Sequence, residues 1–176
     1  MKFLRTAIDG ALIVETESHV DERGVFARTF CAEEFRKHGL EFSVCQCSVS
    51  FNPTRGTLRG LHSQASPHEE VKLVRCSSGA IHDVIVDLRG RSATFMKHFA
   101  VRLSSENRQS LYIPKGVFHG FLTLDNDTEV YYQMSAPYVA GAGLGYRWND
   151  PAFRIQWPLE VSVISPRDAS YPDFQP

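Results

Sequence analysis

The amino-acid sequence predicts a mostly antiparallel β protein, organised as a sandwich or a double-sheet jelly roll. Short segments rich in β-branched and aromatic residues recur along the chain, and Gly, Pro, Asn and Asp separate them. Alternation of apolar and polar residues with period 2 is far more frequent than helical periodicity. Many short strands without an internal repeat are typical of a jelly roll, which leaves room for a ligand cavity between its sheets.

Taken in chain order, one helix precedes a series of strands. Residues 32–40, AEEFRKHGL, carry acidic side chains in the first turn, basic side chains near the end and Gly39 as a stop, which is typical of a short helix. The segments that follow are rich in β-branched and aromatic residues and are bounded by turn residues, which favours strands. These strands are expected at residues 42–51, 71–76, 80–89, 99–104, 110–114, 120–124 and 129–135.

A single domain is expected over residues 1–176. The chain is 43% hydrophobic and 22% charged, and its 176 residues suffice for one core and are short for two. No linker or shift in composition separates two parts of the sequence. The C-terminal stretch from Arg147 is rich in proline and aromatic residues without clear periodicity, so we expect it to wrap around the barrel as loops and short turns.

Charge and composition argue against several classes of function. A net charge of −1 provides no basic field for nucleic acid or an anionic membrane, since binding of many phosphates needs clustered Lys and Arg. No run approaches the ~20 apolar residues of a membrane span, and Arg5, Asp9 and Glu15 interrupt the N-terminal stretch before a signal-peptide core forms. The four cysteines contain no C-x-x-C pair and are interpreted as reduced thiols. We expect a cytoplasmic protein with no nucleic-acid or membrane partner.

Three roles are open for His62, which lies in the segment TLRGLHSQ (57–64): a metal ligand, a catalytic base or a structural histidine. The segment GLHSQASPHEE and the later IPKGVFHGF resemble the paired motifs of the cupin superfamily. Pro114, Gly116 and His119 match the Pro-x-Gly-x-x-His pattern of the second motif. This resemblance implies a double-stranded β-helix, the cupin jelly roll, with one or a few short peripheral helices.

The metal role is the weakest of the three. Metal-binding cupins carry a His-x-His pair and a nearby Glu in the first motif, because a catalytic metal needs three or more protein ligands. Gln64 stands where the second histidine of that pair is needed. Only His62 and His119, with Glu69 or Glu70, are available as ligands. We therefore expect no metal and no other cofactor, which leaves His62 as a base or a structural residue.

Six segments occur in the same order as in one enzyme family. They are DERGVFARTF, RGTLRGLHSQ, PHEEVKLVRCSSGAIHDVIVDLR, SSENRQSLYIPKGVFHGFLTL, EVYYQMSAPY and RWNDPAF…WP…SPRD, which together span about residues 3–170. Through them the chain resembles the dTDP-4-dehydrorhamnose 3,5-epimerases, the metal-independent cupins of deoxysugar biosynthesis. The resemblance implies an isomerase that acts on a nucleotide-linked 4-keto-6-deoxyhexose and inverts one or both carbons flanking the ketone. Each inversion removes a C–H proton, forms an enolate and returns a proton to the opposite face.

The resemblance assigns one residue to each chemical task. The base is His62, because neutral imidazole accepts a proton near pH 7, and Asp168 orients it as the acid in a hydrolase triad does. The acid is Tyr132, whose phenol is protonated at neutral pH. Lys72 stabilises the enolate oxygen. Alternation along the strand brings either Lys72 or Arg75 inward, and the resemblance selects Lys72.

The same resemblance assigns residues to substrate binding. Arg59 and Arg23 contact the diphosphate, where a guanidinium suits phosphate oxygens, and Tyr138 stacks on the nucleobase. Arg23 comes from the neighbouring subunit in this family, so a homodimer is implied. The remaining substrate-binding positions are Phe26, Arg28, Gln46, Ser48 and His119.

Four positions depart from the family pattern. Arg28 and Gly143 stand where better-known members carry Glu, Ser48 stands where they carry Asn, and Ser63 replaces an aromatic residue. Because several of these positions lie on the nucleotide side, the chemistry transfers better than the choice among dTDP, CDP and GDP. Two other functions stay open: a nucleotide-sugar 3,4-ketoisomerase, and a cupin that binds sugar nucleotides without catalysis.

Overall fold

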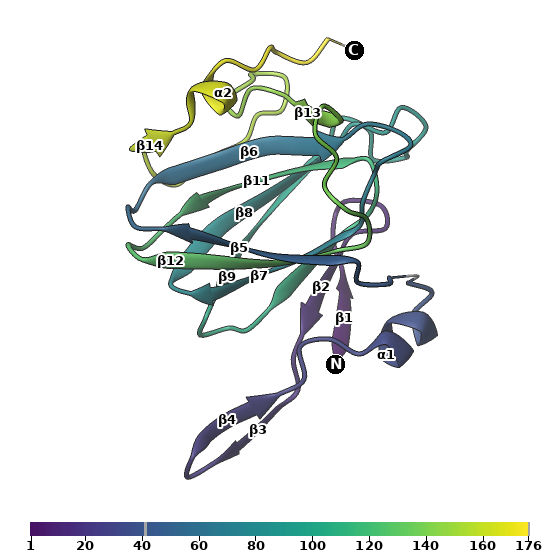
Figure 1. Cartoon of the computed structure of the whole chain (residues 1–176), viewed down its shortest axis with the longest axis vertical. Coiled ribbons are helices and arrows are strands. Elements are labelled where there is room, and N and C mark those ends of the chain that lie inside the picture. The colour runs from purple at the N-terminus through teal and green to yellow at the C-terminus, as the bar shows by residue number, and fades with distance from the viewer. Residues whose placement is uncertain (41, 176) are drawn as a thin grey trace.

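The computed structural model describes residues 1–40 and 42–175 and shows two β-sheets packed face to face (Figure 1). In the view of Figure 1 the lower sheet has the strand order β1-β2-β10-β7-β12-β5, and the upper sheet has the order β13-β6-β11-β8-β9 with β14 beside β6. Every strand pair in these sheets is antiparallel except β14 with β6. The mainly β fold expected from the sequence is confirmed.

Seven strands, β5 and β7 to β12, lie within a few residues of the expected ranges, whereas β1 to β4, β6, β13 and β14 lie outside them. The lower sheet comprises β1 (Lys2–Arg5), β2 (Leu12–Glu15), β5 (Gln46–Asn52), β7 (Lys72–Ser78), β10 (Ser110–Ile113) and β12 (Thr128–Met134). The upper sheet comprises β6 (Thr57–Gln64), β8 (Ala80–Asp87), β9 (His98–Ser104), β11 (Val117–Thr123), β13 (Gly143–Gly145) and β14 (Val163–Ile164). The helices are α1 (Ala32–Lys37) and α2 (Pro166–Ala169), and β3 (Ser18–Asp21) pairs with β4 (Gly24–Ala27) in a separate hairpin.

Strand β6 is absent from the expected strands, because its glycines interrupt the pattern of a strand. Gly60 has φ +127°, and a Cβ on it would lie 2.5 Å from Gly120 Cα on β11. The register between β6 and β11 also shifts between His119 and Phe121. Gly60 therefore permits the close approach of two strands, and the strand that carries His62 is formed by a long-range contact.

The apolar core fills only one part of the space between the sheets. Its fully buried members include Val74 on β7, Ile81 and Ile85 on β8, Leu103 on β9 and Leu111 on β10. At the other end of the sandwich the inner positions of β5 are Gln46, Ser48 and Ser50, which are polar. Small polar side chains cannot close the gap, and a cavity remains there.

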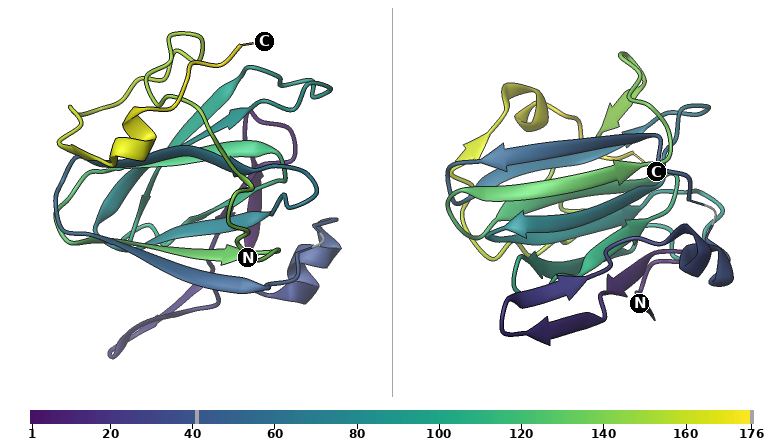
Figure 2. Two further views of the ribbon diagram at one scale, coloured as in Figure 1. Left: turned by 45° about the horizontal axis from the view of Figure 1, so that its top comes forward. Right: turned by 60° about the horizontal axis from the view of Figure 1, so that its bottom comes forward.

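The C-terminal stretch covers the outer face of the upper sheet, and α2 lies over β6 (Figure 2). Phe153, Trp157 and Phe174 from this stretch pack against Val84 and Phe118 of the sheet. The stretch from Arg147 contains two regular elements among the described residues, α2 and β14. Within the described residues no helix is long and apolar enough to cross a membrane.

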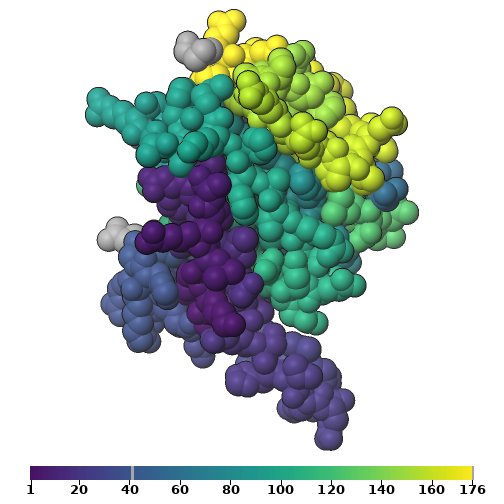
Figure 3. All heavy atoms as spheres, turned by 180° about the vertical axis from the view of Figure 1, so that it is seen from behind, coloured from purple at the N-terminus to yellow at the C-terminus, as the bar shows by residue number. Residues whose placement is uncertain are grey.

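The β3–β4 hairpin projects from the body as an arm, clearly seen from behind in Figure 3 and at the lower edge of Figure 1. Its apolar side chains are largely solvent-exposed, with Val20 at 74% and Phe26 at 77%. An isolated two-stranded hairpin is marginally stable in water. The arm therefore lacks, within one chain, the packing that such side chains normally find.

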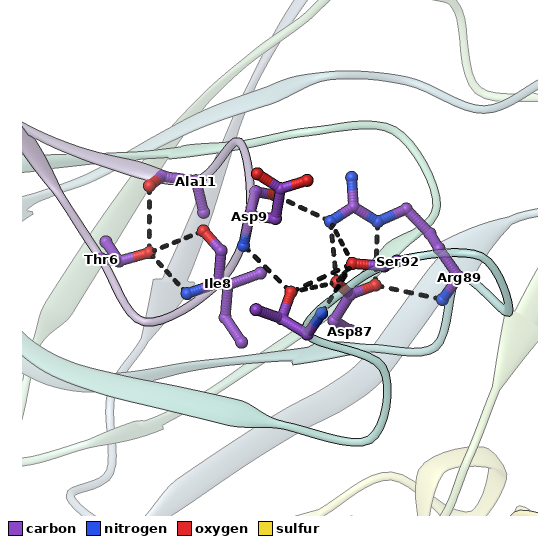
Figure 4. Close-up of polar contacts among 8 residues, drawn as sticks. Thr6, Ile8, Asp9, Ala11, Asp87, Arg89 and Ser92 are labelled. Atoms are coloured by element: carbon purple, nitrogen blue, oxygen red, sulfur yellow. Dashed lines mark hydrogen bonds and ion pairs between the residues drawn. The ribbon is translucent and has the colours of Figure 1, made fainter.

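A buried carboxylate ties the turn between β1 and β2 to the connection between β8 and β9 (Figure 4). Asp87 accepts hydrogen bonds from Arg89 Nε at 2.8 Å, Ser92 Oγ at 2.5 Å and Thr94 Oγ1 at 2.6 Å. Arg89 Nη2 donates to the Asp9 carbonyl oxygen at 2.7 Å. Burial opposes ionisation of Asp87, but these donors outweigh it and hold its pKa well below the ordinary value.

Candidate active site

A cavity of about 740 Å³ opens between the two sheets at the end that the apolar core leaves free. Strands β6 and β11 form its upper wall, β5, β7 and β12 form its lower wall, and α2 closes one side. Polar and charged side chains from all of these elements converge on it. The cavity is lined by most of the residues singled out from the sequence, namely Gln46, Ser48, Arg59, His62, Lys72, His119, Tyr132, Tyr138 and Asp168.

His62 and Asp168 form a hydrogen-bonded pair although 106 residues separate them in sequence. His62 Nε2 donates to Asp168 Oδ1 at 2.8 Å, and the Gly60 backbone N–H donates to Oδ2 at 3.1 Å. Ser165 caps α2 by accepting from the Asp168 N–H at 3.0 Å, which fixes the start of the helix that carries Asp168. Burial raises the pKa of Asp168, but the hydrogen bonds from His62 and Gly60 outweigh this effect and the pKa lies below its ordinary value.

This pairing leaves Nδ1 as the histidine nitrogen available to a ligand. No hydrogen bond to His62 Nδ1 occurs within residues 1–40 and 42–175. An ionised carboxylate on Nε2 holds the proton of the neutral imidazole on that nitrogen, so Nδ1 carries the free lone pair. The ring edge also contacts Tyr171, with 5.8 Å between ring centroids.

A second histidine–carboxylate pair joins the adjacent strand β11 to β8. His119 is opposite His62 in the register of β11 and β6, and its Nε2 lies 2.6 Å from Asp83 Oδ1. Both side chains of this pair are buried. The ring of His119 lies 6.0 Å from that of Tyr132, in an edge-to-face arrangement. The pair therefore connects the upper wall with the phenol of the lower wall.

Tyr132 lies on β12, in the wall opposite His62. Burial, and to a smaller extent the charge of Asp83, strongly raise the pKa of the Tyr132 phenol. The phenol therefore keeps its proton at neutral pH. Tyr131 lies on the outer face of the same strand and is absent from the cavity lining. Alternation thus separates the two neighbouring tyrosines as the sequence predicts.

Lys72 reaches the cavity from the start of β7, whereas Arg75 does not line it. Lys72 Nζ lies 2.9 Å from Glu70 Oε1, and both side chains are nearly buried. Arg59, which also lines the cavity, donates from Nε to Asn52 Oδ1 at 2.8 Å. Two cations of the cavity are thus each held by one neighbouring side chain.

Two charged lining residues, Glu70 and Arg167, are not among the site residues predicted from the sequence. The sequence offers Glu70 only as a candidate metal ligand, and its ion pair with Lys72 is visible only in the folded chain. Arg167 lies at the cavity mouth, with its Cζ 5.7 Å from the centre of the Tyr171 ring. A Cβ at Gly143 would lie 2.9 Å from Arg167 Nη2, so glycine leaves space for the guanidinium. The sequence signal that could have identified Arg167 is its position directly before Asp168 in the segment SPRD.

The structure does not bring Arg23, Phe26 and Arg28 into this cavity within one chain. Arg23 pairs with Asp21 inside the projecting hairpin, Phe26 is exposed, and Arg28 Nη1 lies 3.1 Å from Glu34 Oε1. Gln46 lies in the cavity but also orients the nearby loop, because its Oε1 accepts from the Tyr138 backbone N–H at 3.0 Å.

The remaining histidines, cysteines and carboxylates do not assemble into a metal site. Among residues 1–40 and 42–175, no group of three or more such side chains is arranged to hold a metal ion.

Comparison with known proteins identifies close relatives along the whole chain. Residues 5–176 match the sequence profile of the dTDP-4-dehydrorhamnose 3,5-epimerase family. The dTDP-4-dehydrorhamnose 3,5-epimerase of Methanothermobacter thermautotrophicus is 42% identical, over 97% of this chain and 92% of that protein.

Solved structures give the same result. The enzyme of that name from Bacillus anthracis, with TDP and pyrophosphate bound, superimposes with a TM-score of 0.95 at 36% identity and covers 98% of this chain and 99% of its own. A 3'-monoepimerase from Streptomyces bikiniensis in complex with dTDP-quinovose has a TM-score of 0.91 at 32% identity, over 97% and 86% of the two chains.

Proposed function

The chain belongs to the dTDP-4-dehydrorhamnose 3,5-epimerase family and is an epimerase of sugar nucleotides, and from this premise we propose a metal-free enolate mechanism on a dTDP-linked 4-keto-6-deoxyhexose. The observation that carries the proposal is the placement of an imidazole and a phenol on opposite walls of one cavity, with an ammonium group beside them. Inversion next to a ketone needs a base on one face of the sugar and an acid on the other.

The first half of the reaction uses His62. Nδ1 takes the proton from the carbon next to the ketone, the C–H electron pair forms a C=C bond, and the carbonyl π electrons move to O4 as an enolate. Asp168 stabilises the imidazolium, because its ionised carboxylate lies 2.8 Å from Nε2. A positioned base of this kind accelerates proton transfer by roughly 10²- to 10⁴-fold.

Lys72 carries the developing charge on O4. Its ammonium is held in a nearly buried position, where a fixed positive charge acts more strongly than in water. His119 is the second donor proposed for this region. Both groups are in place before the substrate arrives, so little reorganisation is needed as the enolate forms.

Tyr132 completes the inversion. Its O–H donates a proton to the carbon from the face opposite His62, the enolate returns to the ketone, and proton exchange with water restores the imidazole and the phenol. The raised pKa of Tyr132 ensures that the acid is protonated in the resting enzyme. The same two groups serve C3 or C5 when the sugar presents either carbon between them.

The nucleotide end of the substrate fits the mouth of the cavity. Arg59 and Arg167 supply guanidinium groups for the diphosphate. Tyr138 is 60% exposed at the rim and offers a ring for stacking on thymine, while Gln46 holds the backbone of that loop. The choice of dTDP over CDP or GDP is supported by the ligands bound in the related structures.

The proposal includes a homodimer in which the β3–β4 arm reaches a second chain. The exposed Phe26 and Val20 need a partner surface, and β5 presents Val49 and Phe51 on its outer face, at 56% and 55% exposure. In the dimer, Arg23 contributes to the diphosphate site of the neighbouring subunit, with Phe26 and Arg28 beside it. We place this dimer, one domain over residues 1–176 per chain, in the cytoplasm, where the exposed thiols of Cys45 and Cys47 remain reduced.

Hydrogen exchange in D₂O tests the reaction. We expect dTDP-4-keto-6-deoxyglucose to acquire deuterium at the inverted carbons, detected by NMR, without migration of the carbonyl. The variant His62→Ala is expected to lose exchange at both carbons, and Tyr132→Phe is expected to keep exchange while inversion slows. Migration of the carbonyl would indicate a ketoisomerase, and binding without exchange would indicate a non-catalytic protein. Parallel reactions with CDP- and GDP-linked sugars test the nucleotide.

Mixing two inactive variants tests the shared site. In a dimer of one Arg23→Ala chain and one His62→Ala chain, one of the two sites contains both an intact His62 and an intact Arg23 from its partner. Activity should therefore reappear when the two variants are unfolded and refolded together. No recovery, with heterodimers demonstrated by two different affinity tags, would contradict the contribution of Arg23 in trans.

A further inference from the structure

We propose that Glu70 is a positioning residue that fixes the ammonium group of Lys72 in the cavity, a role that rests on the function proposed above for Lys72. Glu70 is two residues before Lys72, and both side chains line the cavity. Glu70 Oε1 accepts from Lys72 Nζ at 2.9 Å. The side chains are 6% and 12% exposed, so water does not take the place of either partner.

A lysine in this position needs an anchor. Its four-carbon stem has many rotamers, and its ammonium is a point charge without directional preference of its own. A nearly buried charge is also costly unless a partner compensates it. Glu70 meets both requirements with one carboxylate oxygen.

The second carboxylate oxygen connects Glu70 to a rigid part of the fold. Gln64 Nε2 donates to Glu70 Oε2. Gln64 is itself held by the backbone, because its Nε2 donates to the His68 carbonyl oxygen at 3.0 Å and its Oε1 accepts from the Val139 N–H at 2.9 Å. A continuous chain of hydrogen bonds therefore leads from backbone groups through Gln64 and Glu70 to Lys72 Nζ.

This arrangement leaves Lys72 free to act on the substrate. An ammonium has three N–H donors, and Glu70 uses one of them. Two donors remain for the ketone oxygen, in an orientation that is set before binding. Both oxygens of Glu70 are already engaged, so Glu70 acts through Lys72 rather than on the sugar.

The carboxylate is required because two donors converge on it. Lys72 and Gln64 donate to different oxygens of Glu70, and Glu70→Gln replaces one of these oxygens with an NH₂ group that faces a donor, so one of the two bonds is lost. In either case the link between the backbone and the ammonium is broken. Displacement of a catalytic group by about 1 Å is sufficient to slow a reaction roughly 100-fold.

The test compares kcat, KM and the Kd for dTDP in three variants. We expect Glu70→Gln to lower kcat by roughly 10- to 100-fold, with the Kd for dTDP from calorimetry changed less than about twofold. Glu70→Asp keeps the charge and both acceptors and should recover part of kcat. Glu69→Gln is the matched control, because it removes a carboxylate one position earlier that does not line the cavity, and its kcat should equal that of the wild type.

Each result decides the matter. Unchanged kcat in Glu70→Gln would overturn the proposal, and so would a loss of kcat matched by an equal loss of dTDP affinity and thermal stability, because a general structural defect would then explain it. If Glu70→Gln does not fold, Glu70→Asp provides the test. The proposal would be overturned if Glu70→Asp had a kcat at or below one hundredth of the wild-type value and had also lost affinity for dTDP. A wild-type protein that binds dTDP but neither exchanges nor inverts the sugar would instead refute the function on which the proposal rests.

Discussion

Replacement of Asp168 by asparagine should reverse the tautomer of His62. The carboxylate accepts from His62 Nε2 on one oxygen and from the fixed Gly60 N–H on the other. Asparagine has one acceptor oxygen, and the backbone N–H of Gly60 cannot turn away from it. The amide NH₂ then faces Nε2, which must accept, so the imidazole proton moves to Nδ1. A protonated Nδ1 cannot remove a proton from the substrate.

The size of the effect follows from this geometry. An imidazole held in the wrong tautomer by an Asp-to-Asn change loses about 10⁴-fold in kcat in the hydrolase triad. We expect a loss of about 10³- to 10⁴-fold for Asp168→Asn, which corresponds to about 4 to 5 kcal/mol in the activation barrier. Asp168→Ala removes the orienting group without imposing a tautomer, so its loss should be smaller, about 100-fold.

The assay measures the rate of deuterium incorporation at C3 and C5 of the 4-keto sugar by NMR, together with the Kd for dTDP. The Kd should change little, because Asp168 contacts His62 and Gly60 rather than the nucleotide. The tautomer explanation would be refuted if Asp168→Asn exchanged at a rate equal to or above that of Asp168→Ala.

Three further predictions concern stability and binding. Asp87→Asn should lower the free energy of unfolding by about 2 kcal/mol at pH 7. Because the folded-state pKa of Asp87 is lowered, the carboxylate stabilises the fold fully above about pH 4, and this stabilisation is lost as the pH falls through the folded-state pKa. Urea unfolding should therefore show a smaller difference between variant and wild type at pH 3 than at pH 7. Gly60→Ala should lower the free energy of unfolding by more than about 3 kcal/mol, since φ is +127° and the added Cβ meets Gly120. The control Gly90→Ala, whose Cβ has no atom within 4 Å, should stay within about 1 kcal/mol of the wild type in thermal unfolding. Equal melting temperatures of the two variants would contradict this prediction. Arg167→Ala should raise the Kd for dTDP about tenfold with a smaller change in kcat, measured by calorimetry and NMR, and an unchanged Kd would exclude a diphosphate contact.

Much of the fold was predictable because strand alternation is a local property. The period of two placed Lys72 and Arg75 on opposite faces of their strand, and it separated Tyr132 from Tyr131. The helix over 32–40 was also predictable from its charges and its stop signal, although it ends at Lys37. These features depend on neighbours within a few residues, which the sequence contains directly.

Strand β6 and the partners of its histidine were not predictable in this way. Gly60 marks a close approach to Gly120, which is visible only when β11 lies beside β6. Likewise, the sequence resemblance paired His62 with Asp168, but only the folded chain supplies the 2.8 Å contact and identifies Nε2 as the bonded nitrogen. A spacing of 106 residues contains no information about distance.

The sequence by itself determined that this chain is mainly β, which neighbouring residues lie on opposite faces of a strand and which enzyme family it belongs to. The tertiary structure decided which of these residues meet: it left the cavity at the end with polar inner strands, bonded Nε2 of His62 to Asp168, placed Glu70 against Lys72 and held the β3–β4 arm outside. The physical reason is that alternation and turn preference arise from short-range sterics, whereas hydrogen bonds and ion pairs depend on distances that exist only after distant strands have packed.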